Sequence, residues 1–398
     1  MKKKIIAGAV TMTLSVVASA QNSESMEPAG LEIYDGLMLV PALGIEFLHD
    51  DNVARSQDAE IESWVTLINP NLLLLAESGK KEYGLRYSAE IASYFDSEED
   101  DYVDHTLEAF GKFDINIRNY FEVSGSYEDA HEARGTGFSR GFGEFLEEPD
   151  RYQRASLDGR YRYGAQGAKG NIELLAGTQN TEFETALFFD GRDYDTHYGT
   201  GRFIYNRSGK TQLSLELTRR SISYGELPGE FANLDSVENE VLVGASWEAT
   251  AKTTGSIQVG AQEKKFDDVS RSNFSSPTWE VGVLWEPKSH MAFDFSARRD
   301  IEESRGLDDF TDVRTLSLSW INRWSEKLSS TATIYSQDVD YGGLERTEDE
   351  VGSDINLNFQ MKRWLGFSLG YSSQTVESNA DGFGFERNIF FIGASASL

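Results

Sequence analysis

Histidines beside carboxylates are the first residues in this sequence whose type and spacing could do chemistry. His49 precedes Asp50, Asp104 precedes His105, and His131 lies in a further polar stretch. A histidine paired with a carboxylate can activate water as a general base. No Ser-His-Asp or metal-binding motif accompanies these residues, and an acidic chain produces such neighbours by chance. We therefore expect no enzyme activity, no catalytic residue, no metal site and no cofactor.

Arginines and tyrosines at alternate positions are the second candidates. If the apolar faces of the surrounding segments point to lipid, the opposite faces would line a lumen. Acidic residues such as Glu82, Asp158 and Glu216 share these faces. The arginines then form either an ion-pair network that holds the wall rigid, or a track that guides an anionic solute, because guanidinium groups bind carboxylates and phosphates bidentately. The candidate pore-lining residues are Arg86, Tyr152, Arg154, Arg160, Arg162, Tyr198, Arg202, Arg220, Arg298 and Arg323.

The segments that carry these residues show alternation of apolar and polar side chains. Leu213, Leu215 and Leu217 alternate with Ser214 and Glu216, for example. Successive side chains of a strand point to opposite faces, so each segment has one apolar and one polar face. The segments are about 9–14 residues long, as tilted strands that cross an outer membrane must be.

A soluble β-sandwich also alternates, but three features favour a barrel. The segments are longer than the roughly five or six residues typical of sandwich strands. Aromatic residues such as Tyr161, Trp285, Trp320 and Tyr371 lie near the ends of apolar faces, as in interfacial girdles. Short joins also alternate with long ones along most of the chain.

This rhythm predicts an all-β fold, a transmembrane antiparallel β-barrel of about 18 strands, an even number as expected for such barrels. Joins after even-numbered strands are short, which assigns them to the periplasmic side, and the longer, more acidic joins face outward. The predicted strands are 36–50, 61–77, 81–95, 102–115, 119–131, 151–164, 170–183, 194–206, 211–224, 239–250, 254–267, 277–287, 290–302, 312–324, 328–341, 350–361, 365–377 and 387–398.

The long external join at residues 135–150 contains phenylalanines among glycines. Three phenylalanines are costly to expose fully to water. Two arrangements would cover them: the loop folds into the lumen as a constriction, or it packs over the rim against neighbouring loops. The candidate constriction residues are Phe138, Arg140, Phe142 and Phe145.

Both ends of the chain carry export signals. Three N-terminal lysines, a short apolar run and an Ala-Ser-Ala site predict a cleaved signal peptide over residues 1–20. Residues 21–35 form a periplasmic N-terminal lead-in, and residues 36–398 form the barrel. The last segment alternates up to Leu398 and resembles the C-terminal strand by which outer-membrane proteins are recognised for insertion. We expect localisation to the outer membrane of a Gram-negative bacterium.

The charge of the chain excludes some partners. Its 66 acidic and 37 basic residues give a net charge of −29, whereas nucleic acid requires a basic face. The sequence has no cysteine, so no disulfide or thiolate metal site can form. Acidic clusters in the long joins, such as residues 98–101, lack the spacing of an EF-hand and are interpreted as a solvated rim.

Several segments resemble the β-barrel porin 2 family, which is found with exopolysaccharide and capsule synthesis systems. They are the first strand LVPALGIEFLHDDNV at residues 39–53, with its Asp51-Asn52 pair, KEYGLRY at residues 81–87 and DRYQR at residues 150–154. The resemblance implies a pore that passes polysaccharide across the outer membrane beside a periplasmic polysaccharide-export protein. It implies no catalytic residues.

The sequence therefore predicts an outer-membrane β-barrel pore that exports an exopolysaccharide or capsular polysaccharide by passive passage along a wet wall. The alternative is a porin for uptake of sugars or small acidic solutes. The other expected partners are outer-membrane lipid, lipopolysaccharide and, during insertion, the barrel-assembly machinery.

Overall fold

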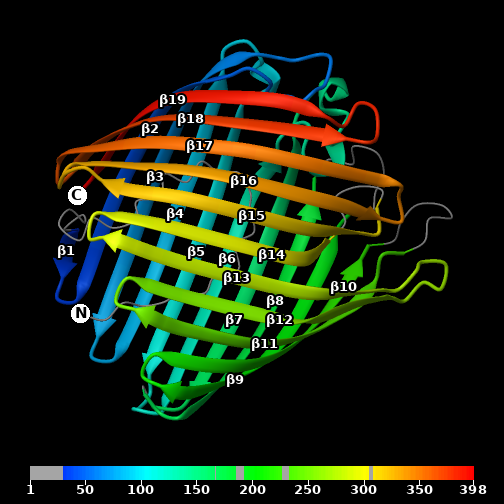
Figure 1. Ribbon diagram of the computed structural model, residues 1–398. Coiled ribbons are helices and arrows are strands. Elements are labelled where there is room, and N and C mark those ends of the chain that lie inside the picture. The colour runs from blue at the N-terminus through cyan, green and yellow to red at the C-terminus, as the bar shows by residue number, and fades with distance from the viewer. Residues whose placement is uncertain (1–29, 166, 185–191, 226–232, 304–307) are drawn as a thin grey trace.

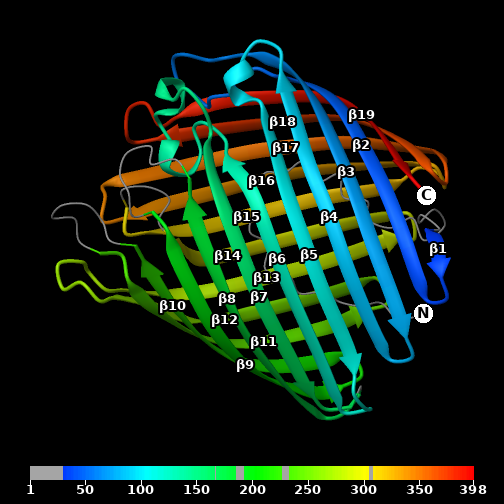
Figure 2. The ribbon, with the colours of Figure 1, turned by 180° about the vertical axis from the view of Figure 1, so that it is seen from behind.

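The computed structural model describes residues 30–398 apart from residue 166 and the segments 185–191, 226–232 and 304–307. The signal peptide predicted over residues 1–20 lies outside the described residues. In the described part, each strand from β2 to β19 pairs antiparallel with its neighbours in the sequence, and β19 pairs with β2. The result is the closed barrel of Figures 1 and 2. This confirms the predicted fold and the predicted count of 18 barrel strands.

The strands follow the alternating segments of the sequence. Their bounds are β2 Leu37–Asp50, β3 Ser63–Ser78, β4 Lys81–Tyr94, β5 Tyr102–Asp114, β6 Asn119–Glu132, β7 Asp150–Tyr163, β8 Gly170–Phe183, β9 Tyr194–Ser208, β10 Thr211–Tyr224, β11 Ser236–Thr250, β12 Thr253–Phe266, β13 Phe274–Lys288, β14 Met291–Glu303, β15 Phe310–Arg323, β16 Leu328–Gly342, β17 Arg346–Lys362, β18 Leu365–Ser378 and β19 Phe385–Ser397. Three short 3₁₀ turns, Glu98–Asp100, Gly137–Ser139 and Gly143–Phe145, lie in the connections.

Three strands begin earlier than the sequence predicts. β11, β13 and β17 start three or four residues before the predicted starts at 239, 277 and 350. The additional residues are mostly polar and lie at the long-loop end, so the alternation that marks a lipid-facing strand is lost there although the backbone ladder continues.

The exposed apolar side chains form an outward belt. Leu215 of β10 pairs with Phe203 of β9 and Val243 of β11, and all three are exposed. Directly paired residues share one face of a sheet, so this row of apolar side chains faces lipid and the alternate rows face the lumen. Among the described residues, no helix is long and apolar enough to cross a membrane.

Substitution of Leu215 by arginine tests which face meets lipid. Leu215 is the middle residue of the exposed row Leu213, Leu215 and Leu217. We expect Leu215→Arg to reduce the free energy of unfolding by about 2–4 kcal/mol, as charged residues do near the bilayer midplane. The measurement is urea unfolding in phospholipid vesicles. Ser214→Arg, on the opposite face, is the control and should cost much less; equal losses would contradict the assignment of faces.

The two ends of the barrel differ. Because the short strand before the barrel is numbered β1, the even-numbered strands of the sequence analysis have odd numbers in the structure. The connections after these strands, beginning with the turn between β3 and β4, contain two to six residues, and the C-terminus lies at this end (Figure 1). The long connections, including residues 51–62 and 133–149, lie at the other end. Because outer-membrane barrels place short turns in the periplasm, we refer to these as the periplasmic and external ends.

A short additional strand, β1 (Leu31–Tyr34), lies within the lead-in, where the sequence analysis placed no strand. It pairs with residues 37–39 of β2, next to the stretch of β2 that pairs with β19. Gly36, with φ of +73°, makes the tight turn between β1 and β2, a conformation that glycine adopts without strain. β1 therefore lies on the same side of β2 as β19. It was not predicted because four residues are too few to show a clear alternation.

Candidate functional site: lumen wall and external cap

The lumen-facing side of β4 to β14 is a wall of paired charges. Arg86 contacts Glu108 at 3.0 Å, and Arg160 contacts Glu173 at 2.9 Å. Each pair joins neighbouring strands, because the alternate positions on adjacent strands point to the same side. These contacts bring positive and negative charges together along the wall, as expected for an ion-pair network.

The other arginines of this wall also have acidic partners. Arg154 contacts Glu128 at 3.3 Å, Arg220 contacts Glu238 at 2.7 Å, and Arg298 contacts Glu302 at 3.4 Å. Arg202 lies between Glu216 and Glu173, with a distance of 3.5 Å to the second. Most of these side chains are partly exposed, whereas Glu173 and Glu238 are buried, and the pairing neutralises the charge of the wall.

The remaining candidates on the inward face stack on aromatic rings or donate hydrogen bonds. The guanidinium of Arg162 lies 4.9 Å from the ring centre of Tyr120, and that of Arg154 lies 4.7 Å from that of Tyr152. Tyr198 donates a hydrogen bond to Asp158. The backbone N–H of Arg323, at the periplasmic end of β15, donates to His290. That the ten residues line a conducting pore stays a prediction.

The opposite wall, from β15 to β19, carries mainly hydroxyl, amide and small side chains. Ser319 and Thr333 share a hydrogen bond at 2.8 Å and lie in register with Asp354. Between Arg323 at the periplasmic end and Glu350 at the external end, the charged residues of this wall are Asp354 and Arg387, and Arg387 binds Asp50 of β2. Other polar residues of this wall include Ser317, Thr331, Asn356, Asn358, Ser368, Ser372 and Ser395. This wall was not among the candidates predicted from the arginines, although the scarcity of charge at its alternate positions is visible in the sequence.

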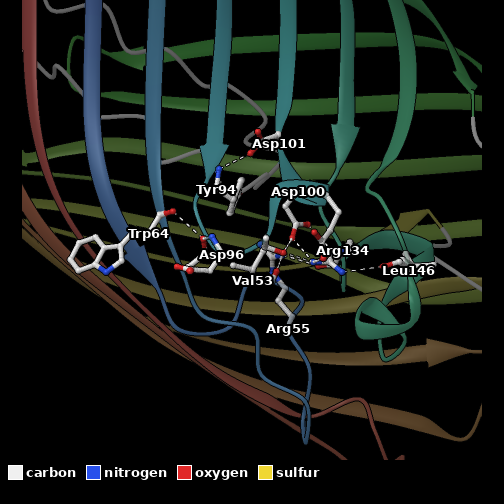
Figure 3. Close-up of polar contacts among 12 residues, drawn as sticks. Val53, Arg55, Trp64, Tyr94, Asp96, Asp100, Asp101, Arg134 and Leu146 are labelled. Atoms are coloured by element: carbon white, nitrogen blue, oxygen red, sulfur yellow. Dashed lines mark hydrogen bonds and ion pairs between the residues drawn. The ribbon is translucent and has the colours of Figure 1, made fainter.

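Residues 133–149, between β6 and β7, form the main part of a cap at the external end. The loop is fixed at its base by Arg134, which lies between Asp100 and Leu146 in Figure 3. The Nε of Arg134 donates to Asp100 at 2.8 Å, and a terminal nitrogen donates to Ser97 at 2.9 Å. Arg134 and Asp100 are both almost fully buried. Removing one partner of such a pair costs about 3–5 kcal/mol, so the loop base is held firmly.

The first external loop, residues 51–62, packs against this cap. Arg55 donates to the backbone oxygen of Arg134 at 3.0 Å and has a φ of +50°, which is unusual for a residue other than glycine (Figure 3). The side-chain amide of Asn52 donates to Ser56 and Glu386, each at 2.8 Å. Arg55 and Asn52 therefore tie the first external loop to both the cap and the last strand.

The far end of the cap reaches β17. Arg140 pairs with Glu348 at 2.5 Å, and the Glu348 side chain is fully buried. β17 lies seven strands from β6 around the barrel, so this contact spans most of the external mouth. The ring of Phe142 packs on the edge of Phe383, with centres 5.7 Å apart. Gly141 also lies against Phe383, where a larger residue would clash.

The two other phenylalanines of the cap have different surroundings. The guanidinium of Arg192 lies 4.0 Å from the ring centre of Phe138, and the same arginine contacts Glu132 at 3.3 Å. Phe145 is 74% exposed. The loop thus crosses the mouth and packs against its rim and a neighbouring loop. That it constricts a conducting pore stays a prediction.

Charge pairing keeps the cap arginines ionised. Burial alone would lower the pKa of Arg134, but the hydrogen bonds and charge of Asp100 outweigh it and raise the pKa above its ordinary value. For Arg140, the effect of burial is outweighed by Tyr341 and Glu348, which raise its pKa. Burial and repulsion from Arg387 instead lower the pKa of Arg55 to about 9.

The histidine and carboxylate pairs lie apart from one another. Nδ1 of His131 lies 3.0 Å from Asp104, and Nδ1 of His105 lies 2.9 Å from the Tyr87 hydroxyl. The His49 ring packs edge-on against Trp64. Within the described ranges, no group of three or more histidine, cysteine, aspartate or glutamate side chains could hold a metal ion.

Sequence comparison identifies a family. A family model described as "Putative beta-barrel porin 2" matches residues 25–398, nearly the whole chain. No curated protein sequence matches the chain.

Solved structures share the fold at low sequence identity. The FrpB iron transporter from Neisseria meningitidis is 10% identical with a TM-score of 0.51, over 85% of this chain, which spans 62% of that protein. OccK2 (OpdF) from Pseudomonas aeruginosa is 11% identical with a TM-score of 0.52, over 92% of this chain and 98% of that one. The siderophore receptor PirA from P. aeruginosa is 8% identical with a TM-score of 0.50, over 90% and 80%. At these identities the likeness shows the barrel fold alone.

Proposed function

The chain belongs to the β-barrel porin 2 family of outer-membrane proteins, and from this premise we propose that it is the conduit through which an exopolysaccharide or capsular polysaccharide leaves the cell. Family and fold together place it in the outer membrane of a Gram-negative bacterium. The proposal adds the cargo and the outward direction of transport.

The hydrogen-bonding wall of β15 to β19 is the observation that carries the proposal. Side chains such as Ser319, Thr333, Asn356 and Asn358 offer donors and acceptors without a full charge. The hydroxyl groups of a sugar chain can exchange hydrogen bonds with such a wall and with the water beside it. A barrel of this strand number leaves room for a water-filled interior.

The paired charges of the facing wall support the same function. An arginine bound to a carboxylate on its own wall, as Arg160 is to Glu173, offers less attraction to a passing chain than a free arginine. Transport through a pore requires sites weak enough for the cargo to leave. The wall therefore allows a hydrated chain to slide, with the direction set by synthesis and by a periplasmic export partner.

Deletion of the gene in its native host tests this function. We expect secreted polysaccharide to fall at least tenfold while the polymer accumulates inside the cell, because the outer membrane blocks polymers that lack a conduit. The measurement is polysaccharide in the medium, at the cell surface and in the periplasm. Expression of the intact chain in trans should restore secretion.

A double substitution of the hydrogen-bonding wall, Asn356→Leu with Asn358→Leu, should reduce the restored secretion several-fold. Leu357→Ile, on the outward face between them, is the matched control and should restore it fully. Unchanged secretion in the deletion strain would refute the export function. Uptake of sugars by the reconstituted barrel would then be the function to measure.

A further inference from the structure

We propose that the exported polysaccharide is anionic and is drawn into the barrel by a ring of cations at the periplasmic mouth. This inference rests on the export function proposed above and adds the chemical class of the cargo. It starts from the unequal distribution of charge between the two ends of the barrel.

The eight periplasmic turns are basic although the chain as a whole is strongly acidic. Seven of them contain a lysine or arginine, and the eighth, between β13 and β14, contains His290. Glu326 is the one acidic residue among the described residues of these turns. We call the seven basic residues the periplasmic cation ring; they are Lys80, Arg118, Lys169, Lys210, Lys252, Lys327 and Arg363.

Every member of the periplasmic cation ring is exposed. Lys252, for example, donates to the backbone oxygen of Pro287 at 2.7 Å. Figures 1 and 2 show that these turns follow one another around one end of the barrel, so the cations that they carry surround its periplasmic opening. Like charges arranged around an opening add their fields and raise the local concentration of the opposite charge.

The external connections have the reverse charge. Their described residues include 21 aspartates and glutamates but only five arginines. Four of these arginines pair with buried or half-buried carboxylates: Arg134 with Asp100, Arg140 with Glu348, Arg192 with Asp150, and Arg271 with Asp309. Arg55, the fifth, binds backbone oxygens. The external cations therefore hold the cap together, and the external surface is left strongly acidic.

This polarity favours anions that come from the periplasm. At physiological ionic strength the field of exposed charges extends about 8 Å, which covers the approach to an opening. A polyanion in the periplasm is attracted to the ring, whereas an anion outside the cell is repelled by the external face. Within the barrel, the paired arginines are too well neutralised to hold the chain. The same polarity opposes uptake of small acidic solutes from outside.

Polymer block of single channels tests the inference. The full-length barrel is inserted in phosphatidylcholine bilayers, and polygalacturonate or dextran of equal length is added to one side. Arg140→Ala serves as the background, because we expect loss of the ion pair with Glu348 to release the cap. Since the chain has no cysteine, Glu345→Cys in an external loop reports orientation through an impermeant thiol reagent.

We expect polygalacturonate on the periplasmic side to block the current at a concentration about tenfold lower than polygalacturonate on the external side. The same tenfold difference is expected relative to dextran on either side. Replacing the seven ring residues by glutamine should abolish this difference. A matched control changes four exposed external carboxylates, Asp58, Glu60, Glu98 and Glu99, to their amides; it should keep the preference for the periplasmic side.

Equal block by dextran, or a polyanion block that survives the glutamine substitutions, would overturn the inference. The inference would also be overturned if the glutamine variant lost co-purified phosphatidylglycerol but showed no change in block, because the ring would then bind lipid. The export function can fail separately: the deletion strain would still secrete polymer while the polyanion block persisted. Conversely, loss of a neutral secreted polymer on deletion would keep the export function and refute the anionic cargo.

Discussion

An Arg387→Ala barrel is expected to lose about 3–5 kcal/mol of unfolding free energy. Arg387 of β19 binds Asp50 of β2 through two of its nitrogens, across the seam where the barrel closes. The Asp50 side chain is almost fully buried and also accepts the backbone N–H of Asn52 at 3.1 Å. Alanine would leave this buried carboxylate without the cation that hydrogen-bonds to it. The loss is measured by urea unfolding in vesicles, with the heat-dependent shift in gel mobility as the readout of the folded fraction.

Arg314→Ala is the matched control for the seam pair. Arg314 pairs with Asp340 at 2.7 Å, but both side chains are largely exposed. Such pairs contribute about 0–1 kcal/mol, so this variant should unfold almost like the parent. A second variant, Asp50→Leu with Arg387→Met, removes both charges and should recover part of the loss. Similar losses for Arg387→Ala and Arg314→Ala would contradict the role assigned to the seam pair.

The second large effect is expected at the external cap. Arg140→Ala removes the ion pair with Glu348, which holds the far end of residues 133–149 across the mouth. In this variant Glu348 still accepts the hydrogen bond of the Tyr341 hydroxyl at 2.8 Å and still pairs with Arg346 at 3.3 Å, so β17 should not be disturbed. The loop loses its charged contact with the opposite rim, and the single-channel conductance in planar bilayers should rise several-fold.

Two further variants separate release of the cap from general damage. Arg140→Lys keeps the charge but not the planar fork, and should give an intermediate conductance. Phe145→Ala, in the same loop but largely exposed, should conduct like the parent. If Arg140→Ala leaves the conductance unchanged while the barrel stays folded, the cap does not limit passage.

The strands could be predicted because a lipid-facing strand imposes a strict period of two on its side chains. The row Leu213, Leu215 and Leu217 identifies β10 and its outward face without any knowledge of its neighbours. The inward position of Arg160 and Arg220 follows from the same period. Their individual partners depend on the register between strands, which the alternation alone does not define.

The cap could not be predicted in the same way, because its contacts join residues far apart in the sequence. Arg140 and Glu348 belong to segments with no shared pattern, and Glu348 by itself looks like one more acidic residue near a loop. Arg134 was not singled out for the same reason, and Asp100 was wrongly assigned with residues 98–101 to a solvated rim, whereas it is buried against Arg134. The three phenylalanines indicated that the loop must be covered, but not which part of the rim covers it.

The position of β1 makes the N-terminal segment sensitive to completion of the barrel. Gly30 donates to the backbone oxygen of Leu398 at 3.0 Å, and Leu398 donates to that of Pro41 at 3.2 Å. The first contact can form only after β19 has joined β2, since Leu398 reaches this place only then. Leu398 therefore lies in line with β1 along the same side of β2, and residues appended to it in the same direction would displace β1. An affinity tag for this protein therefore belongs in an external connection such as residues 343–345.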